Sequence, residues 1–236
     1  MISTSKEPAR IAGMFDAIAR RYDTLNHVLS AGLDRRWRRT LIRALQLSPR
    51  DRVLDVCTGT GDLALAAARQ SPARQVVGVD FAAAMLQIGR DKIQRAGLGR
   101  RVQLVRGDAT RLPVADASVD AAMVAFGIRN VVDVDRGLAE LRRTLKAGGR
   151  LAILEFGLPR NRHLGALYQS YFRHILPRIG RLVSRHSDAY SYLPASVAEF
   201  PSGEAFCARL QAAGFSGARS VRMAMGAVYL YVAVNA

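Results

Sequence analysis

Between residues 52 and 157, two hydrophobic patterns take turns along the chain. Short apolar runs typical of buried strands alternate with longer segments whose apolar residues recur at helical spacing. The predicted strands are 52–57, 75–80, 102–109, 119–126 and 149–157, and the predicted helices are 62–71, 83–97 and 134–146. Repeated strand–helix units predict a Rossmann-like α/β fold, in which a doubly wound, mostly parallel sheet is covered on both faces.

The two ends of the chain have other patterns. Residues 9–47 have apolar positions at helical spacing and predict helices that lie over the site. The C-terminal part predicts a basic amphipathic helix (163–186), a loop (190–204), a helix (204–214) and two strands, the last of which (227–236) closes the sheet. We therefore predict seven strands, with an antiparallel strand at the C-terminus.

The whole chain, residues 1–236, is predicted to form a single domain. Its parts are a helical cap (1–47), a cofactor-binding core (48–157), a helical insertion that acts as a lid or faces a membrane (158–200), and a C-terminal helix with strands (201–236).

Composition limits the possible locations and cofactors. Half of the residues are hydrophobic and the mean hydropathy is +0.04, but no apolar run approaches the roughly 18–20 residues of a membrane span. The N-terminus lacks the apolar core of an export signal, so a cytoplasmic location is expected. Two cysteines, Cys57 and Cys207, are too few for a disulfide framework or a zinc cluster. We expect no metal, and Cys57 is expected to fill space beside the site.

The net charge of +16 comes almost entirely from arginine. Such a charge attracts polyanions or an anionic membrane surface. A compositional bias that replaces surface lysine by arginine explains it equally well, and the sequence leaves both explanations open. The chain has no zinc finger, aromatic RNA-binding strand or basic tail, so no nucleic-acid partner is expected.

A glycine turn follows the first predicted strand. Gly59, Gly61 and Ala64 fit the spacing G-x-G-x-x-G/A, which binds a dinucleotide or S-adenosylmethionine. Asp55 precedes the turn and Asp62 follows it. A pyrophosphate about 4 Å from such a carboxylate would be repelled by about 4 kcal/mol at an effective dielectric constant near 20. The turn therefore favours S-adenosylmethionine, which carries an ammonium and a sulfonium. Taken singly, Asp62 is equally explained as a helix cap, and Asp55 as a carboxylate that holds loop amides.

The second and third predicted strands end at acidic residues. Asp80, followed by Phe81, lies where a carboxylate would bind the ribose hydroxyls of the cofactor. Asp108 suits the adenine amino group, with the backbone amide of Ala109 beside it. Because the carboxyl ends of parallel strands meet at one edge of a sheet, these residues and the glycine turn are expected to form one site.

Several segments of the chain resemble known enzymes. The core segments VLDVCTGTGD, VVGVD, GDATRLPVADASVDAAMV and LKAGGRLAILE resemble class I S-adenosylmethionine-dependent methyltransferases. The segments RYDTLNHVLSAGLDRRWRR, FGIRN and YSYLPASVAEFP look like the quinone-biosynthesis C-methyltransferases, which act on demethylmenaquinone or the ubiquinone precursor. This resemblance covers nearly the whole chain and implies S-adenosylmethionine as cofactor. It implies cofactor contacts at Thr60, Asp80, Asp108 and Ala109.

The chain departs from the pattern of this family at three positions. Ala125 stands where the family often has serine, so a side-chain hydrogen bond is lost while a backbone contact with the cofactor is retained. Leu25 replaces a methionine and Asp34 replaces a histidine. We interpret Asp34 as structural.

The reaction that the resemblance implies is methylation of a ring carbon of a reduced polyprenyl quinone, most simply demethylmenaquinol. Removal of a proton from the ring hydroxyl would make the adjacent carbon nucleophilic. Arg129 is expected to stabilise the resulting phenolate, Asn130 to orient the ring oxygen, and Tyr22 to bond the substrate or the cofactor. Two alternatives stay open: Arg129 pairs with a neighbour such as Asp133 and only fixes its loop, and His27 is a structural histidine rather than a base.

The polyprenyl tail of such a substrate would bring the enzyme to the inner face of the membrane. The stretch 163–186 combines an apolar face with arginines and suits an anionic surface. It is equally explained as a lid over the pocket, and some of its residues could instead form a homodimer. An RNA methyltransferase and an NAD-dependent oxidoreductase are the competing functions. The apolar segment VAFGIRN argues against the first, and Asp55 and Asp62 argue against the second.

Overall fold

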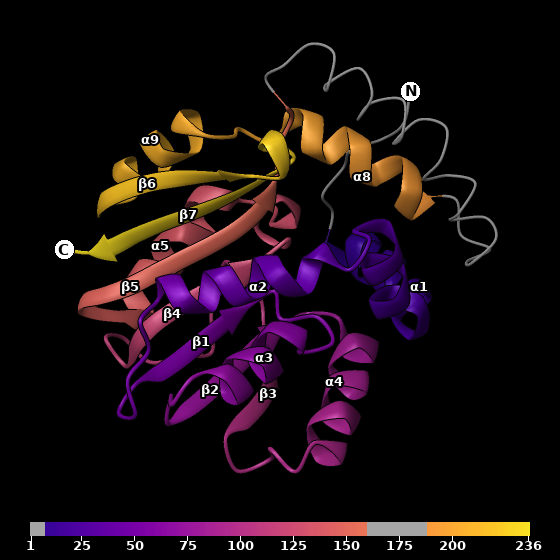
Figure 1. The fold of residues 1–236 in the computed structure, drawn as a ribbon, viewed down its shortest axis with the longest axis horizontal. Helices are drawn as coiled ribbons and strands as arrows, with labels where there is room; N and C mark the ends of the chain where they lie inside the picture. The colour runs from indigo at the N-terminus through magenta and orange to yellow at the C-terminus, as the bar shows by residue number, and fades with distance from the viewer. Residues whose placement is uncertain (1–7, 160–187) are drawn as a thin grey trace.

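The computed structural model of the protein describes residues 8–159 and 188–236 (Figure 1). Its helices are α1 (Pro8–Leu29), α2 (Leu33–Ala44), α3 (Asp62–Gln70), α4 (Ala83–Arg95), α5 (Val134–Thr144), α8 (Asp188–Glu199) and α9 (Glu204–Ala212), with 3-10 turns η1 (Ile128–Asn130) and η3 (Ala224–Gly226). Its strands are β1 (Arg52–Val56), β2 (Gln75–Asp80), β3 (Val102–Arg106), β4 (Val119–Ala125), β5 (Leu145–Phe156), β6 (Phe215–Met223) and β7 (Val228–Asn235).

The strands form one seven-stranded sheet in the order β3-β2-β1-β4-β5-β7-β6. β1 to β5 pair in parallel, and β7 is antiparallel to both β5 and β6. The predicted fold class is therefore confirmed. The strand order reverses between β1 and β4, and in doubly wound sheets this switch point is where ligands bind.

Successive apolar side chains along the strands point to opposite faces of the sheet. Helices therefore cover both faces. Leu54 of β1 packs into a core layer with Leu138 of α5 and Phe206 of α9. Val53, the preceding residue, points into the other layer with Leu41 of α2 and the apolar residues of α3. In Figure 1, α1 and α8 lie apart from these layers, near the ends of the strands where the connecting turns meet.

The predicted helical run at the N-terminus is broken into α1 and α2. Ala31 and Gly32 adopt left-handed backbone conformations, with φ of 49° and 77°. Two consecutive residues in this region end one helix and redirect the chain into the next. As a result, α2 packs against the sheet while α1 turns toward α4 (Figure 1).

Two predictions for the C-terminal part are wrong. Residues 190–204 were expected to form a loop, but α8 continues through Pro194 to Glu199. Tyr192, Val197 and Phe200 are buried, so tertiary packing offsets the backbone hydrogen bond that the proline cannot donate.

The final strand does not close the sheet, because β7 lies between β5 and β6. Seven of the eight residues of β7 are buried or half-buried, whereas five of the nine residues of β6 are exposed. The strand that is apolar on both faces therefore takes the inner place, and β6 forms the edge.

Element ends differ from the predictions by a few residues. β3 ends at Arg106, and the next residue is Gly107, where a Cβ would lie 2.6 Å from Pro113, so that only glycine fits there. The predicted helix 134–146 ends at Thr144, and Leu145 already pairs with Val119 as the start of β5.

The predicted amphipathic helix at 163–186 lies outside the described residues, and the division into cap, core, insertion and C-terminal part stays a prediction. Within residues 8–159 and 188–236, we find no helix with the length and apolar character needed to span a bilayer.

Candidate active site

A cavity that opens to solvent lies at the carboxyl ends of β1 to β4. Its wall comes from α1, from the turns that follow the four strands, and from the start of α4. The lining residues are Ile11, Phe15, Tyr22, Cys57, Gly59, Val79, Asp80, Phe81, Met85, Gly107, Asp108, Ala109, Ala125, Phe126, Gly127, Asn130, Val131 and Val132. Most of them are apolar, and polar groups are concentrated at the strand ends.

Asp80 lies at the end of β2 and lines the cavity. One of its carboxylate oxygens accepts the backbone N–H of Gly59 at 2.8 Å, and the other accepts that of Ala82 at 2.9 Å. Burial raises the pKa of Asp80, although these amides favour the charged form. The carboxylate thus holds the glycine turn, and because it also lines the cavity it can accept a hydrogen bond from a ligand hydroxyl.

The other strand ends contribute Phe81, Asp108, Ala109 and Ala125 to the same wall. Asp108 accepts the backbone N–H and the hydroxyl of Thr110 at 2.8 Å and 2.9 Å, both on Oδ1. The structure therefore brings Asp80, Phe81, Asp108, Ala109 and Ala125 to one cavity, as the predicted site requires.

The tips of β1 and β4 approach each other closely at the switch point. Cys57 and Phe126 have left-handed backbones, with φ of 57° and 60°, which cost residues other than glycine about 1–3 kcal/mol each. A Cβ at Gly127 would lie 2.3 Å from the Cβ of Cys57. The close approach of the two tips therefore requires glycine at position 127. Cys57, Phe126 and Gly127 all line the cavity.

Tyr22 extends from α1 into the cavity wall. Burial raises the pKa of its hydroxyl, which is hydrogen-bonded to Asn26. The phenol is therefore neutral at physiological pH and can donate a hydrogen bond to a ligand oxygen. Arg129 acts in the opposite direction on this pKa, so its positive charge is felt at the Tyr22 hydroxyl.

Asn130 ends the turn η1 and lines the cavity. It is 8 % exposed, and its Oδ1 has no hydrogen-bond partner in the described part of the chain. A buried acceptor left without a donor costs about 1–3 kcal/mol. This oxygen is therefore suited to accept a hydrogen bond from a hydroxyl of a bound ligand.

Arg129 is not among the described residues that line the cavity. Its guanidinium pairs with Glu155 at 2.7 Å, donates to the carbonyl of Phe126 at 2.6 Å and contacts the Ser196 hydroxyl at 3.4 Å. Glu155 is fully buried at the end of β5. The alternative that Arg129 fixes its loop is thus observed, but with Glu155 as partner, whereas Asp133 caps α5.

Three other predicted cofactor residues, Asp55, Thr60 and Gly61, support the cavity without lining it. Asp55 is buried, accepts the Thr58 hydroxyl at 2.5 Å, and has a pKa raised to about 7 by burial. Gly61 has φ of 76° and precedes α3. These residues therefore contact the glycine turn without facing the cavity.

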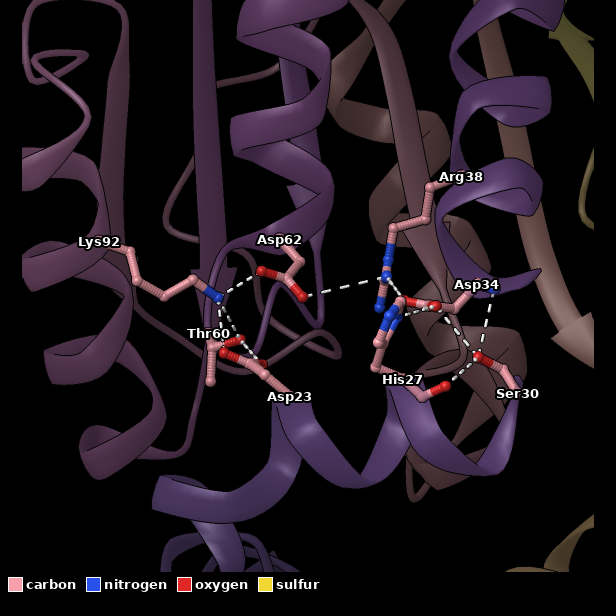
Figure 2. A network of polar contacts seen from close by, with 8 residues as sticks. All are labelled: Asp23, His27, Ser30, Asp34, Arg38, Thr60, Asp62 and Lys92. Atoms are coloured by element: carbon pink, nitrogen blue, oxygen red, sulfur yellow. Dashed lines mark hydrogen bonds and ion pairs between the residues drawn. The ribbon is translucent and has the colours of Figure 1, made fainter. Parts of the chain in front are cut away.

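The sequence argument treated Asp62 as a free negative charge beside the ligand, and this premise is wrong. Asp62 forms an ion pair with Lys92 of α4, and Arg38 of α2 lies 3.9 Å from its other oxygen (Figure 2). Its charge is therefore compensated only in part, because Lys92 also pairs with Asp23 and Arg38 also pairs with Asp34. Lys92 is 30 residues away in sequence, so no local pattern could reveal the pairing.

The same network accounts for the departure from the family pattern at Asp34. This carboxylate is buried and binds Arg38, the Ser30 hydroxyl at 3.0 Å and His27 Nδ1 at 3.1 Å (Figure 2). The neighbouring Arg38 and these hydrogen bonds lower the pKa of Asp34 against the opposing effect of burial. Both His27 and Asp34 thus hold the turn between α1 and α2.

Sequence reasoning did not assign several apolar wall residues to the site. Ile11 and Phe15 were predicted only as apolar positions of a helix over the site, and with Tyr22 they line the cavity from α1. Their spacings of four and seven residues place all three on one helical face. That periodicity marks a buried face but does not tell whether a core or a ligand covers it.

Comparison with known proteins agrees with this geometry. The model of the ubiE/COQ5 methyltransferase family matches residues 3–235. A protein of Geotalea uraniireducens named ubiquinone/menaquinone biosynthesis C-methyltransferase UbiE is 45% identical over 233 residues, covering 98% of this chain and 99% of that protein. A demethylmenaquinone methyltransferase of Deinococcus radiodurans is 50% identical over 203 residues, covering 86% and 83%.

A solved structure of a SAM-dependent methyltransferase from Thermotoga maritima superposes with a TM-score of 0.62 at 22% identity. The superposition covers 94% of this chain and all of that one. At this level of identity, the likeness supports the fold alone.

Proposed function

The chain belongs to the ubiE/COQ5 methyltransferase family and is an S-adenosylmethionine-dependent C-methyltransferase of quinone biosynthesis, and we propose that its acceptor is demethylmenaquinol. A relative of high identity named for this substrate supports the choice. The observation that carries the proposed mechanism is the mainly apolar cavity at the switch point. Both Asp80 and Asn130 line it, and the Oδ1 of Asn130 has no hydrogen-bond partner in the described part of the chain.

The residues at the strand ends fit S-adenosylmethionine. Asp80 lines the cavity with its carboxylate, which would accept hydrogen bonds from the ribose hydroxyls. Asp108 and Ala109 would hold the adenine ring, and the backbone at Gly59 and Ala125 would line the methionine part. Asp55, Thr60 and Gly61 would act indirectly, by keeping the glycine turn in shape. When bound, S-adenosylmethionine supplies an electrophilic methyl group on its sulfonium.

The acceptor would lie between α1 and η1. Asn130 Oδ1 would accept a hydrogen bond from one ring hydroxyl, and Tyr22 would donate a hydrogen bond to the other ring oxygen, which gives its proton to a water molecule. These two contacts would orient the ring so that the carbon beside the ionised hydroxyl faces the methyl group. Phe15 and Val132 would exclude water from the ring. The hydrogen of the methylated carbon leaves as a proton after transfer.

We assign Arg129 a role that differs from direct contact with the phenolate. Its ion pair with Glu155 anchors η1, which carries Asn130, and its bond to Ser196 ties η1 to α8. Its charge also lowers the pKa of Tyr22, so it favours negative charge on that side of the cavity. Arginine keeps its proton at all relevant pH values and does not act as the base.

We propose further that the enzyme works as a peripheral protein on the cytoplasmic face of the membrane, where the polyprenyl tail of its acceptor lies. The net charge of +16 supports attraction to anionic lipid. Flotation with vesicles of phosphatidylglycerol and phosphatidylcholine is expected to carry the protein upward at low salt and less at high salt. Failure to float at low salt would reject this location, and sedimentation in the same buffer distinguishes a homodimer from a monomer.

The acceptor is tested by methyl transfer from radiolabelled S-adenosylmethionine to two reduced substrates, demethylmenaquinol and 2-methoxy-6-polyprenyl-benzoquinol. We expect product with demethylmenaquinol, with the label on the ring carbon. Methylation of the benzoquinol alone would overturn the choice of acceptor while leaving the C-methyltransferase activity intact.

A further inference from the structure

We propose that Lys92 is a positioning residue whose pairing with Asp23 fixes α1 over the cavity and thereby sets the wall that the acceptor meets. Lys92 lies on α4 and does not line the cavity. Its role for the acceptor rests on the proposed function, but its structural effect can be measured without any substrate.

The ammonium of Lys92 meets three oxygens from three different elements (Figure 2). It lies 2.8 Å from Asp23 Oδ2 of α1 and 3.1 Å from Thr60 Oγ1 of the glycine turn, and it pairs with Asp62 of α3. A lysine has three N–H donors, so each can be used once. Its side chain is 20 % exposed and that of Asp23 is 36 % exposed, so solvent screens the pair in part.

Asp23 is one of two carboxylates by which α1 is held on α4. Asp16 accepts the backbone N–H of Ala84 at 3.0 Å, and Asp23 binds Lys92. The two aspartates are seven residues apart and share a helical face. Between these polar contacts lies an apolar cluster of α1 and α4 residues that includes Ile18 and Met85. Apolar packing tolerates sliding, whereas two polar contacts at its ends fix the register of α1 on α4.

The position of α1 on α4 affects the cavity, because residues adjacent in sequence to these contacts line its wall. Tyr22, next to Asp23, and Gly59, next to Thr60, both line the wall. The Thr60 hydroxyl donates to Asp23 Oδ1 at 2.6 Å, so the threonine for which the resemblance implied a cofactor contact ties the glycine turn to α1. Lys92 therefore joins the acceptor side of the cavity to its cofactor side.

The first test is hydrogen–deuterium exchange of the full chain with Lys92→Met, Asp23→Asn and the double variant. We expect backbone amides of α1 to exchange about tenfold faster in each single variant, as for a loss of about 1.4 kcal/mol, while those of β1 and β4 keep their rates. The double variant should exchange no faster than the faster single variant, because both remove the same contact. Arg95→Met is the matched control, since Arg95 is exposed on α4 and binds only Asp91 of its own helix among the contacts found.

Unchanged exchange in α1 of both single variants, or equal acceleration by Arg95→Met, would overturn the proposal. The second test measures kcat/KM for demethylmenaquinol. We expect about a tenfold loss in each single variant and no further loss in the double variant, whereas Arg95→Met stays at the wild-type value. Losses that multiply in the double variant would also overturn it. If the wild type does not methylate the quinol, the proposed acceptor is wrong, but the exchange result still decides the role of Lys92.

Discussion

Replacement of Asp80 by asparagine tests the proposed position of the cofactor most directly. The carboxylate accepts two backbone amides, from Gly59 at 2.8 Å and Ala82 at 2.9 Å. Asparagine keeps the shape of the side chain but has only one accepting atom. Asp80→Asn therefore leaves one of the two amides facing an NH2 group, and it removes the negative charge from the proposed ribose site.

The magnitudes follow from these contacts. A buried amide without an acceptor costs about 1–3 kcal/mol, so the free energy of unfolding should fall by about that amount. Each ribose hydroxyl would lose a hydrogen bond to a charged group, which is worth about 1.5–3 kcal/mol. For two hydroxyls, the loss of binding free energy is about 3–6 kcal/mol. The affinity for the cofactor should then fall by about 10²- to 10⁴-fold.

Calorimetric titration with S-adenosylhomocysteine measures this affinity, and thermal unfolding checks that the variant is folded. Asp91→Asn is the control, because Asp91 is an exposed carboxylate of α4 that bonds Gln87. We expect the control to bind like the wild type. A folded Asp80→Asn protein that binds within threefold of the wild type would refute the assignment of Asp80 to the ribose.

Three further predictions follow from single contacts. Burial raises the pKa of Asp55 from 3.8 to about 7, so the folded state loses stability relative to the unfolded chain as pH rises from about 4 to about 7. The side chain of Asp55→Asn cannot ionise, so the Tm of the variant relative to the wild type should be higher at pH 8 than at pH 5. A difference in Tm that does not depend on pH would contradict this. Asn130→Ala should lower kcat/KM for the quinol about 10- to 100-fold, with little change in cofactor affinity by calorimetry, since Oδ1 has no partner in the described chain; unchanged turnover would remove its role. Gly127→Ala should lower the free energy of unfolding in urea by about 1–3 kcal/mol, because its Cβ would meet Cys57 at 2.3 Å, and Cys57→Gly in the same chain should restore most of it; no rescue would mean that another contact is at fault.

The fold was predictable because its signals are local. The strand–helix alternation between residues 52 and 157 comes from side chains that must be buried on two faces, and that pattern is repeated in each unit. The errors arose where packing overrides local preference. Residues 190–204 were predicted to form a loop, but the burial of Tyr192 and Val197 keeps α8 helical. Apolar residues on both faces of β7 move it to the inside of the sheet.

The site was predictable in part. Asp80, Asp108 and Ala109 reach one cavity because the carboxyl ends of neighbouring parallel strands always meet. The charge argument at the glycine turn was incomplete, since Lys92 compensates Asp62 from a distant helix. Arg129 pairs with Glu155 rather than with Asp133, and its part in the reaction stays a prediction.

The sequence by itself determined the succession of strands and helices between residues 52 and 157, the ligand-facing edge of the sheet and the family, because each of these is written in short local segments of the chain. Only the tertiary structure decided which charges are paired and which residues face the cavity. A carboxylate at a strand end can bind a ligand, hold a turn or meet a lysine, and the choice depends on which distant side chain lies within about 3 Å of it. Lys92, which connects Asp23, Thr60 and Asp62, is such a side chain.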